Sequence, residues 1–250
     1  MYKVEGGNLS LQESIFGHHD EILDCAFIGE KQNHLAIAPN EREIRIIDVH
    51  TSICEVLPGH RDTVLCLDRS VAGDWLASGS KDHEVRLWHL EFSEHRLTFS
   101  CYAILKGHAG SVSAIALPRK KSSGAPHFVI SGSDDRTVKC WDMATGTTTT
   151  PFTPRSVYTQ KAHDKDINSI DVSSDDKLFA TASQDRTIKI FNVDDGQVVG
   201  VLKGHRRGVF STKFSAVEKV IISGSGDATV KLWNLTDFTC LKVGISLDLC

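Results

Sequence analysis

Histidine and cysteine are the side chains of this 250-residue chain that could bind a metal, act as a general base or serve as a nucleophile. The seven cysteines are scattered and include no Cys-x-x-Cys pair, so we expect neither a disulfide framework nor a zinc ribbon. Among the twelve histidines, His18 and His19 stand directly before Asp20, but two adjacent side chains make a poor metal-ligand set. The sequence therefore predicts no metal site, and it favours small apolar strand positions for the cysteines.

Catalytic motifs of other kinds are also missing from the sequence. It contains no Gly-x-Ser-x-Gly elbow, no Walker A loop and no Gly-x-Gly-x-x-Gly run. No histidine is paired with an acidic residue at the spacing of a metalloprotease motif. We therefore do not expect an enzyme, and we expect no catalytic residues, no cofactor and no small-molecule substrate.

Composition excludes further classes of protein. With 28 basic and 32 acidic side chains the formal net charge is -4, whereas a general nucleic-acid binder is strongly basic. The longest apolar stretches, such as Val198 to Leu202, reach about half a dozen residues, far below the roughly 20 that a membrane-spanning helix needs. The first residues carry no apolar segment before a small-residue cleavage site. We therefore expect no membrane association, and a cytosolic or nuclear protein.

One pattern is written five times along the chain. Each copy begins with a histidine after glycine or alanine, and a β-branched residue follows four positions later. The opening pairs are Gly17-His18, Gly59-His60, Gly107-His108, Ala162-His163 and Gly204-His205. In the last four copies a strand of small residues ends in an acidic turn, and an aromatic residue stands six positions after the turn aspartate. The alternation of apolar and polar residues before each aromatic indicates strands rather than helices.

These motifs resemble WD40 repeats, whose unit of about 40 to 45 residues forms one four-stranded blade of a β-propeller. Successive histidines stand between 42 and 55 residues apart, and we expect the excess to form surface loops over 91–100, 118–125 and 145–159. The resemblance implies an all-β WD40 β-propeller with five recognisable four-stranded blades, in an incomplete seven- or eight-bladed ring. A closed five-bladed ring and an open arc are the alternatives.

The repeat also divides the chain into units. We expect an N-terminal lead-in with a candidate outer strand over 1–16, propeller blades over 17–242 and a divergent C-terminal tail over 243–250. The expected blades span 17–58, 59–106, 107–161, 162–203 and 204–242. Relatives of this kind carry further blades and another propeller, so we expect the chain to be part of a longer protein.

The resemblance further implies a structural hydrogen-bond network in each blade, in which the histidine bridges the turn aspartate and a strand hydroxyl that reaches the tryptophan. Such a network stabilises a blade only when every buried polar member is satisfied. The residues that match are His60, Ser78, Asp82 and Trp88; His108, Ser131, Asp135 and Trp141; His163, Thr181 and Asp185; and His205, Ser223, Asp227 and Trp233. Phe191 replaces the tryptophan of the fourth blade, and the first blade is degenerate because Ile37 occupies its hydroxyl position.

Strings outside the generic repeat narrow the resemblance. The segments 17–24, 163–169, 204–208 and 237–242 are similar to the second propeller of the transducin beta-like WD40 proteins of the small-subunit processome. This resemblance implies a non-enzymatic nucleolar scaffold in small-subunit ribosome assembly and pre-rRNA processing. The implied partners are other WD40 proteins of the processome, precursor ribosomal RNA and its guiding small nucleolar RNA, contacted directly or indirectly.

Two other binding functions stay open as alternatives. A WD40 substrate receptor of a cullin-type ubiquitin ligase often carries Trp-Asp-x-Arg at a blade end, whereas Trp141-Asp142 is followed by Met143-Ala144. A general signalling scaffold would want an N-terminal coiled coil, and residues 1–16 contain no heptads.

Local basic segments are the candidates for direct RNA contact. Arg206 and Arg207 follow a repeat histidine, and Lys120 and Lys121 lie in the enlarged segment over 118–125. We expect these side chains to contact phosphates rather than bases, since basic side chains on a slightly acidic protein can bind a backbone only locally.

Overall fold

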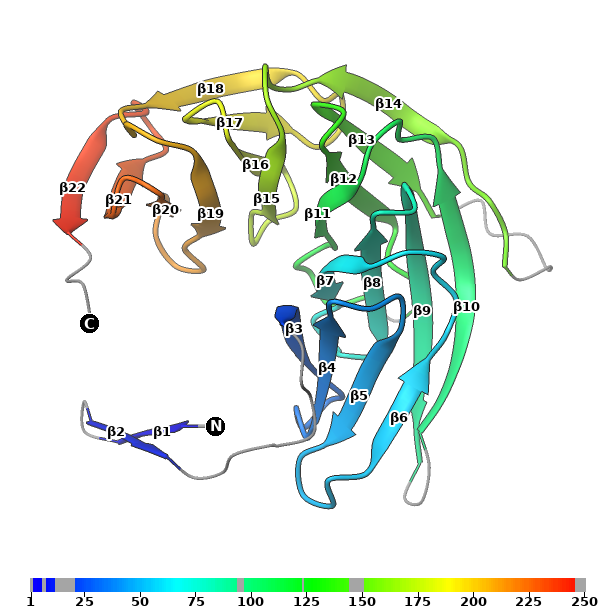
Figure 1. Ribbon diagram of the computed structural model, residues 1–250. Coiled ribbons are helices and arrows are strands. Elements are labelled where there is room, and N and C mark those ends of the chain that lie inside the picture. Colours follow the sequence, from blue (N-terminus) through cyan, green and yellow to red (C-terminus); the bar gives the residue numbers. More distant parts are fainter. Residues whose placement is uncertain are drawn as a thin grey trace.

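The computed structural model describes residues 2–5, 8–11, 21–93, 97–122, 124–143 and 151–245. Every regular element in this part of the chain is a β-strand (Figure 1). The hairpin of β1 (Tyr2–Glu5) and β2 (Asn8–Leu11) forms a sheet of its own, and the other strands form five four-stranded antiparallel sheets. None of the described residues forms a helix long and apolar enough to cross a membrane.

The five sheets have the same layout, with strands in chain order from the innermost to the outermost. The first sheet consists of β3 (Ile22–Ile28), β4 (His34–Pro39), β5 (Ile44–Asp48) and β6 (Cys54–Leu57). The second consists of β7 (Val64–Arg69), β8 (Trp75–Ser80), β9 (Glu84–Phe92) and β10 (Leu97–Lys106). The third consists of β11 (Val112–Ala116), β12 (Phe128–Ser133), β13 (Thr137–Asp142) and β14 (Ser156–Lys161). The fourth consists of β15 (Ile167–Val172), β16 (Leu178–Ser183), β17 (Thr187–Asn192) and β18 (Val198–Lys203), and the fifth of β19 (Val209–Phe214), β20 (Val220–Ser225), β21 (Thr229–Asn234) and β22 (Cys240–Ile245).

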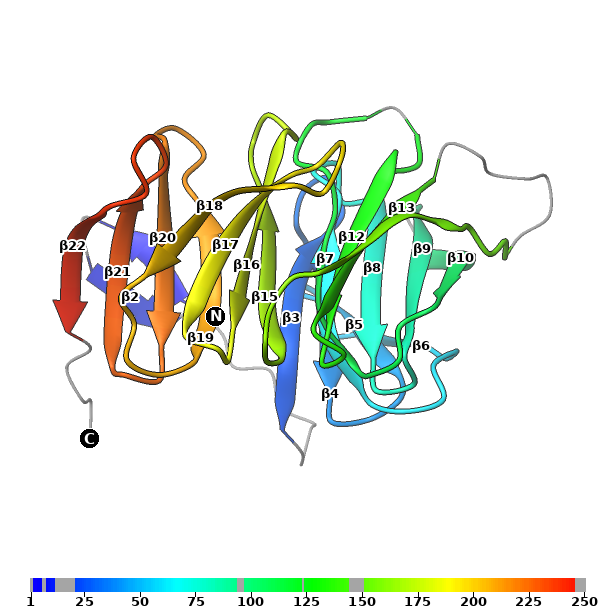
Figure 2. The same ribbon diagram turned by 90° about the horizontal axis from the view of Figure 1, so that it is seen from above.

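The sheets stand side by side in an arc. Contacts join each innermost strand to the next one, from β3 through β7, β11 and β15 to β19. Figure 1 shows a gap between the fifth and the first sheet, with the hairpin β1–β2 lying in it. Figure 2 shows that the strands run across the thickness of the arc, so that their connections form two opposite faces. The prediction of an all-β propeller with five four-stranded blades in an incomplete ring is therefore confirmed.

The apolar core lies between neighbouring sheets rather than around one centre. Each of the four clusters of buried side chains draws on two successive sheets. The second strand of the second sheet, Trp75–Ser80, is buried along its whole length. Its small residues permit this close packing, since a Cβ atom on Gly79 would lie only 2.8 Å from the Val112 side chain of the next sheet.

Several segments differ from the predicted surface loops and tail. Most of 91–100 is strand, because β9 and β10 form an extended hairpin, and Leu97 is only 8% exposed where it packs between the first and second sheets. Residues 156–159 likewise belong to β14. At the C-terminal end β22 pairs with β21 through Ile245, so residues 243–245 extend the fifth sheet instead of starting a tail. In the predicted lead-in, β2 pairs with β1 and not with a blade, and His18, His19 and Asp20 lie outside the described residues.

Candidate interaction surfaces of the blades

The second sheet brings four of the predicted network residues together. His60 Nδ1 lies 2.9 Å from Asp82 Oδ2, and its Nε2 lies 2.8 Å from Ser78 Oγ. The Trp88 indole N–H donates to the same Ser78 Oγ at 2.9 Å. The third and fifth sheets repeat this arrangement within 0.1 Å, through His108, Ser131, Asp135 and Trp141 and through His205, Ser223, Asp227 and Trp233.

One assignment of protons satisfies the whole network. If Nδ1–H of a neutral histidine donates to the aspartate, its Nε2 accepts from the serine O–H, and the serine oxygen accepts from the indole. Burial disfavours the charged carboxylates, but hydrogen bonds from the histidines, from threonine hydroxyls and from backbone N–H groups outweigh it. They hold the pKa well below its usual range in Asp82, Asp135, Asp185 and Asp227. The network therefore contains an ionised acid at the turn of each of these sheets.

The fourth sheet keeps the network without the indole. His163 lies 2.8 Å from Asp185 Oδ2 and 2.7 Å from Thr181 Oγ1. In place of an indole hydrogen bond, the Phe191 ring stacks on Phe179 with 4.9 Å between ring centroids and 8° between planes. This position of the blade therefore contributes apolar packing where its neighbours contribute a donor.

A second hydroxyl at the turn was missed by the sequence reasoning. Thr137, Thr187 and Thr229 each donate to the second oxygen of the turn aspartate, at 2.6, 2.6 and 2.5 Å. Their position two residues after each aspartate was visible in the sequence as part of the repeat. In the second sheet Glu84 takes this position instead, and it forms ion pairs with Arg61, Arg86 and Lys106.

A cavity of about 830 Å³ lies on the inner side of the arc, lined mainly by the innermost strands. Carboxylates there link successive sheets, because Asp24 accepts the backbone N–H of Leu67 at 2.8 Å and Asp68 accepts that of Leu117 at 2.7 Å. Asp171 accepts the N–H of Phe214 in the same way, at 2.8 Å. Each acid thus bonds to the innermost strand, or the residue just after it, in the following sheet.

Arg119 adds an ionic connection that spans three sheets. Its guanidinium lies 3.1 Å from Asp68 of the second sheet and 2.8 Å from Asp171 of the fourth. Lys213 of the fifth sheet reaches Asp171 at 3.0 Å. Arg119 belongs to the basic segment predicted to form a surface loop over 118–125, and its pairing with Asp68 and Asp171 is not predictable from the sequence because both lie far from it along the chain.

The four basic candidates for RNA contact lie on opposite faces of the arc. Arg206 and Arg207 are exposed in the connection that enters β19, whereas Lys120 and Lys121 are exposed in the connection that leaves β11. Backbone N–H groups of Arg119 and Lys120 bind Asp176 of the fourth sheet, at 2.6 and 3.1 Å, so this second connection is held against the neighbouring blade. The structure therefore does not bring the two basic pairs together into one surface.

Metal binding has no candidate in the described part of the chain. No group of three or more histidine, cysteine, aspartate or glutamate side chains there has an arrangement that could hold an ion. The six cysteines that the structure describes are free thiols.

Comparison with known proteins gives two relatives that are similar to most of this chain. The chain is 38% identical over 207 residues to human Transducin beta-like protein 3, a match that covers 80% of this chain and 25% of the human protein. It is 36% identical over 211 residues to the U3 small nucleolar RNA-associated protein 13 of Saccharomyces cerevisiae, covering 80% of this chain and 26% of the yeast protein. The chain thus spans about a quarter of the length of these curated relatives.

A more distant relative is similar over 76% of this chain and 30% of its own length. The chain is 25% identical over 223 residues to Mitochondrial division protein 1 of Saccharomyces cerevisiae. The family model described as WD domain, G-beta repeat matches residues 51–89, 99–142, 154–192 and 196–234. These matches cover more than half of the chain, and each takes in the outermost strand of one sheet and the three inner strands of the next, from β6 to β21. By this match, and by the repeated histidine, aspartate and tryptophan network, the chain belongs to the WD40 family.

Proposed function

We propose that the chain is part of a non-enzymatic WD40 scaffold that acts in small-subunit ribosome assembly and pre-rRNA processing in the nucleolus. Its partners are other WD40 proteins of the small-subunit processome, with precursor ribosomal RNA and the guiding small nucleolar RNA contacted directly or through those proteins. The scaffold works by presenting loops on two faces of rigid blades, and it has no small-molecule substrate.

The similarity to the yeast U3 small nucleolar RNA-associated protein 13 is the observation that carries this proposal. That similarity extends over 80% of the chain at 36% identity, whereas the blade signature alone also matches the mitochondrial division protein at 25%. Identity well above the level of the generic repeat supports a shared role, since fold alone does not decide function.

Direct contact with RNA is the finer part of the proposal, and it rests on Arg206 and Arg207. Both are exposed, and neither has an ion-pair partner among the described residues. Arginine forks suit phosphate oxygens, and their contribution falls as salt is raised. Lys120 and Lys121, on the opposite face, are the second candidate pair.

Affinity purification from nuclear extract tests both levels of the proposal. The tagged chain is compared with Arg206→Glu/Arg207→Glu and with Lys120→Glu/Lys121→Glu, which reverses the same charge on the other face. We expect the unaltered chain to recover processome proteins by mass spectrometry and U3 small nucleolar RNA by quantitative reverse transcription. Loss of RNA from one variant alone assigns the contact to that face.

Other outcomes of this purification would contradict the proposal. Recovery of a cullin adaptor without processome proteins favours the ubiquitin-ligase alternative. Equal RNA recovery from all three chains removes both basic pairs as contacts while leaving the protein partners in place.

A further inference from the structure

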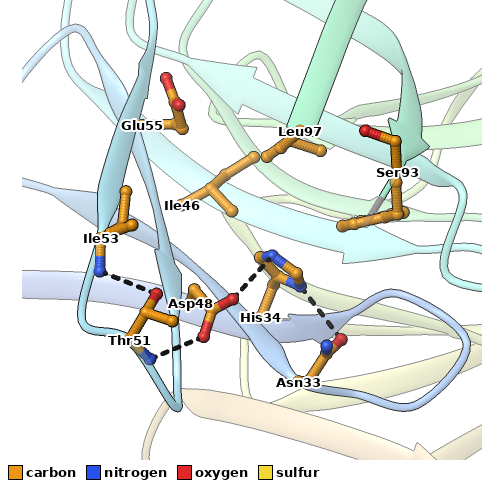
Figure 3. Close-up of a pocket in the computed structure, with 10 residues that line it drawn as sticks. Asn33, His34, Ile46, Asp48, Thr51, Ile53, Glu55, Ser93 and Leu97 are labelled. Carbon is orange, nitrogen blue, oxygen red and sulfur yellow. Dashed lines mark hydrogen bonds and ion pairs between the residues drawn. The ribbon is translucent and has the colours of Figure 1, made fainter. Parts of the chain in front are cut away.

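An open pocket of about 310 Å³ lies between the first and second sheets (Figure 3). The first sheet contributes His34 from β4, Ile46 and Asp48 from β5, and Glu55 from β6. The extended hairpin of the second sheet contributes Leu97, together with Phe92 at the end of β9. The pocket therefore exists because β9 and β10 are longer than the corresponding strands of the other sheets and reach across to the first one.

The corresponding place is filled at the following junctions between sheets. Glu55 on the outermost strand of the first sheet pairs with Ile46 on the neighbouring strand. The residues at the same position on the outermost strands of the next three sheets are Ala103, Tyr158 and Gly200. Phe152 of the third sheet's connection bridges to Ala103, and the Tyr158 ring packs directly on Gly196 of the fourth sheet. The Phe238 ring of the fifth sheet covers Gly200. Only the first of these four described positions holds a carboxylate beside an open pocket.

In β6 an acidic side chain takes an inner position and an apolar side chain takes an outer one. Glu55 is half-buried and faces the pocket, while its neighbour Val56 points outward and is 38% exposed. No described residue gives the Glu55 side chain a hydrogen bond or an ion pair. The Glu55 carboxylate is therefore available to pair with a cation bound in the pocket.

The other polar groups add negative charge and do not neutralise it. Backbone N–H groups of Thr51 and His50 bind Asp48 Oδ1 and, with Thr51 contributing most, lower the pKa of Asp48. The second oxygen of Asp48 lies 3.6 Å from Nε2 of His34. Burial lowers the pKa of His34, although Asp48 opposes this, and the ring is therefore neutral near pH 7. The described residues that line the pocket include two carboxylates and no lysine or arginine.

The walls of the pocket are apolar. Ile46 and Leu97 are 1% and 8% exposed, and they close its inner side. The Phe92 ring lies 4.9 Å from the His34 ring, at 51° between planes. Such walls suit a ligand that combines a hydrocarbon stem with a positively charged end, as the long basic side chains do.

We propose that this pocket binds an arginine side chain of a partner protein. The arginine stem lies along Leu97 and Ile46, and the guanidinium pairs with the Glu55 carboxylate at one end of the pocket, while Asp48 at the other end adds negative charge (Figure 3). A planar guanidinium can form two parallel hydrogen bonds to one carboxylate, which a lysine ammonium does less well. An anionic ligand such as nucleic acid is disfavoured by the two carboxylates. The inference does not depend on the proposed role in ribosome assembly.

Binding of short peptides to the full chain tests this proposal. A fluorescent peptide of alternating glycine and arginine is titrated by anisotropy, beside peptides in which citrulline or lysine replaces arginine. Citrulline keeps the shape of arginine but has no charge. We expect the arginine peptide to bind, the citrulline peptide to bind at least tenfold more weakly, and the lysine peptide to fall between them.

Three variants assign the binding to the pocket. Glu55→Gln removes one charge with little change of shape and should weaken the arginine peptide by about tenfold. Ile53→Trp should weaken it by about the same factor, because the larger side chain fills the mouth while both carboxylates stay. Glu30→Gln removes an exposed carboxylate outside the pocket and should have no effect. Thermal unfolding shows that each variant keeps the stability of the parent chain.

Four results would overturn the inference. The first is that the arginine peptide fails to bind the parent chain, and the second is that the citrulline peptide binds as tightly as the arginine peptide. The third is that Glu30→Gln weakens binding as much as Glu55→Gln does, which would indicate general electrostatic attraction. The fourth is that the lysine peptide binds as tightly as the arginine peptide, which would remove the preference for a planar cation.

Discussion

The serine at the centre of each blade network carries two hydrogen bonds at once. Ser131 is fully buried, and it joins the Trp141 indole to His108 at 2.8 Å on both sides. Removing its hydroxyl leaves a buried N–H and a buried imidazole nitrogen without partners. The cost of such groups, rather than the strength of each bond, makes this residue important for stability.

We predict that Ser131→Ala lowers the free energy of unfolding by about 3 kcal/mol, because two buried polar groups lose their partner. Thr181→Val is the matched comparison, since Thr181 serves His163 but no indole. We expect it to cost about half as much. Urea unfolding followed by tryptophan fluorescence measures both. Equal losses would show that the indole bond contributes nothing.

The turn aspartates make stability depend on acid pH. Their pKa lies below the ordinary value of 3.8, so the folded state binds protons less readily than the unfolded chain does. Their stabilising contribution is present above that ordinary value and is lost as pH falls below it toward the folded pKa. We predict that the urea midpoint drops between about pH 5 and pH 2, and that Asp135→Asn, though less stable at pH 7, shows a smaller drop. An unchanged pH profile in Asp135→Asn would remove Asp135 from this account.

At the scale of elements, the repeated spacing predicted the strands far better than the connections. In the second to fifth sheets the turn aspartate and the aromatic residue six positions later define one hairpin, and the register between its strands is the same in all four. The extended β9–β10 hairpin was not foreseen, because its apolar residues serve contacts with the first sheet and do not follow the repeat. The ion pairs of Arg119 could not be predicted for a related reason, because its partners lie 51 and 52 residues away in the sequence.

We predict that Arg119→Ala destabilises the arc by about 3 kcal/mol, since it leaves Asp68 and Asp171 with less compensation in a mostly buried position. Arg119→Lys keeps the charge, but its single ammonium group cannot contact both carboxylates through separate nitrogen atoms as the guanidinium does. It should therefore recover only part of the lost free energy of unfolding. Chemical unfolding of the two variants beside the parent chain measures this. Full recovery by lysine would mean that charge alone matters at this position.

At the scale of the whole molecule, one face of the fifth sheet differs from its counterparts. Ile222 and Val230 are 46% and 40% exposed, whereas Ile130 and Val138 at the same positions of the third sheet are fully buried by the fourth. Leu232, which pairs with Ile222 on the same face, is half-buried, whereas Cys140 at the same position of the third sheet is buried. The arc therefore presents an apolar sheet face of the kind that other sheets of the same molecule bury.

We predict that the chain alone self-associates through this face and has low solubility. Replacing Ile222 and Val230 by threonine keeps branched side chains in the strands while making the face polar. Light scattering at increasing protein concentration should show the average mass of the parent chain rising and that of the double variant staying near one chain. Threonine at Val157 and Val199, which are exposed on outer strands of other sheets, is the control and should leave association unchanged. A monomeric parent chain with a cooperative thermal transition would contradict the prediction. It would show that exposure of this apolar face to water does not drive two chains to associate.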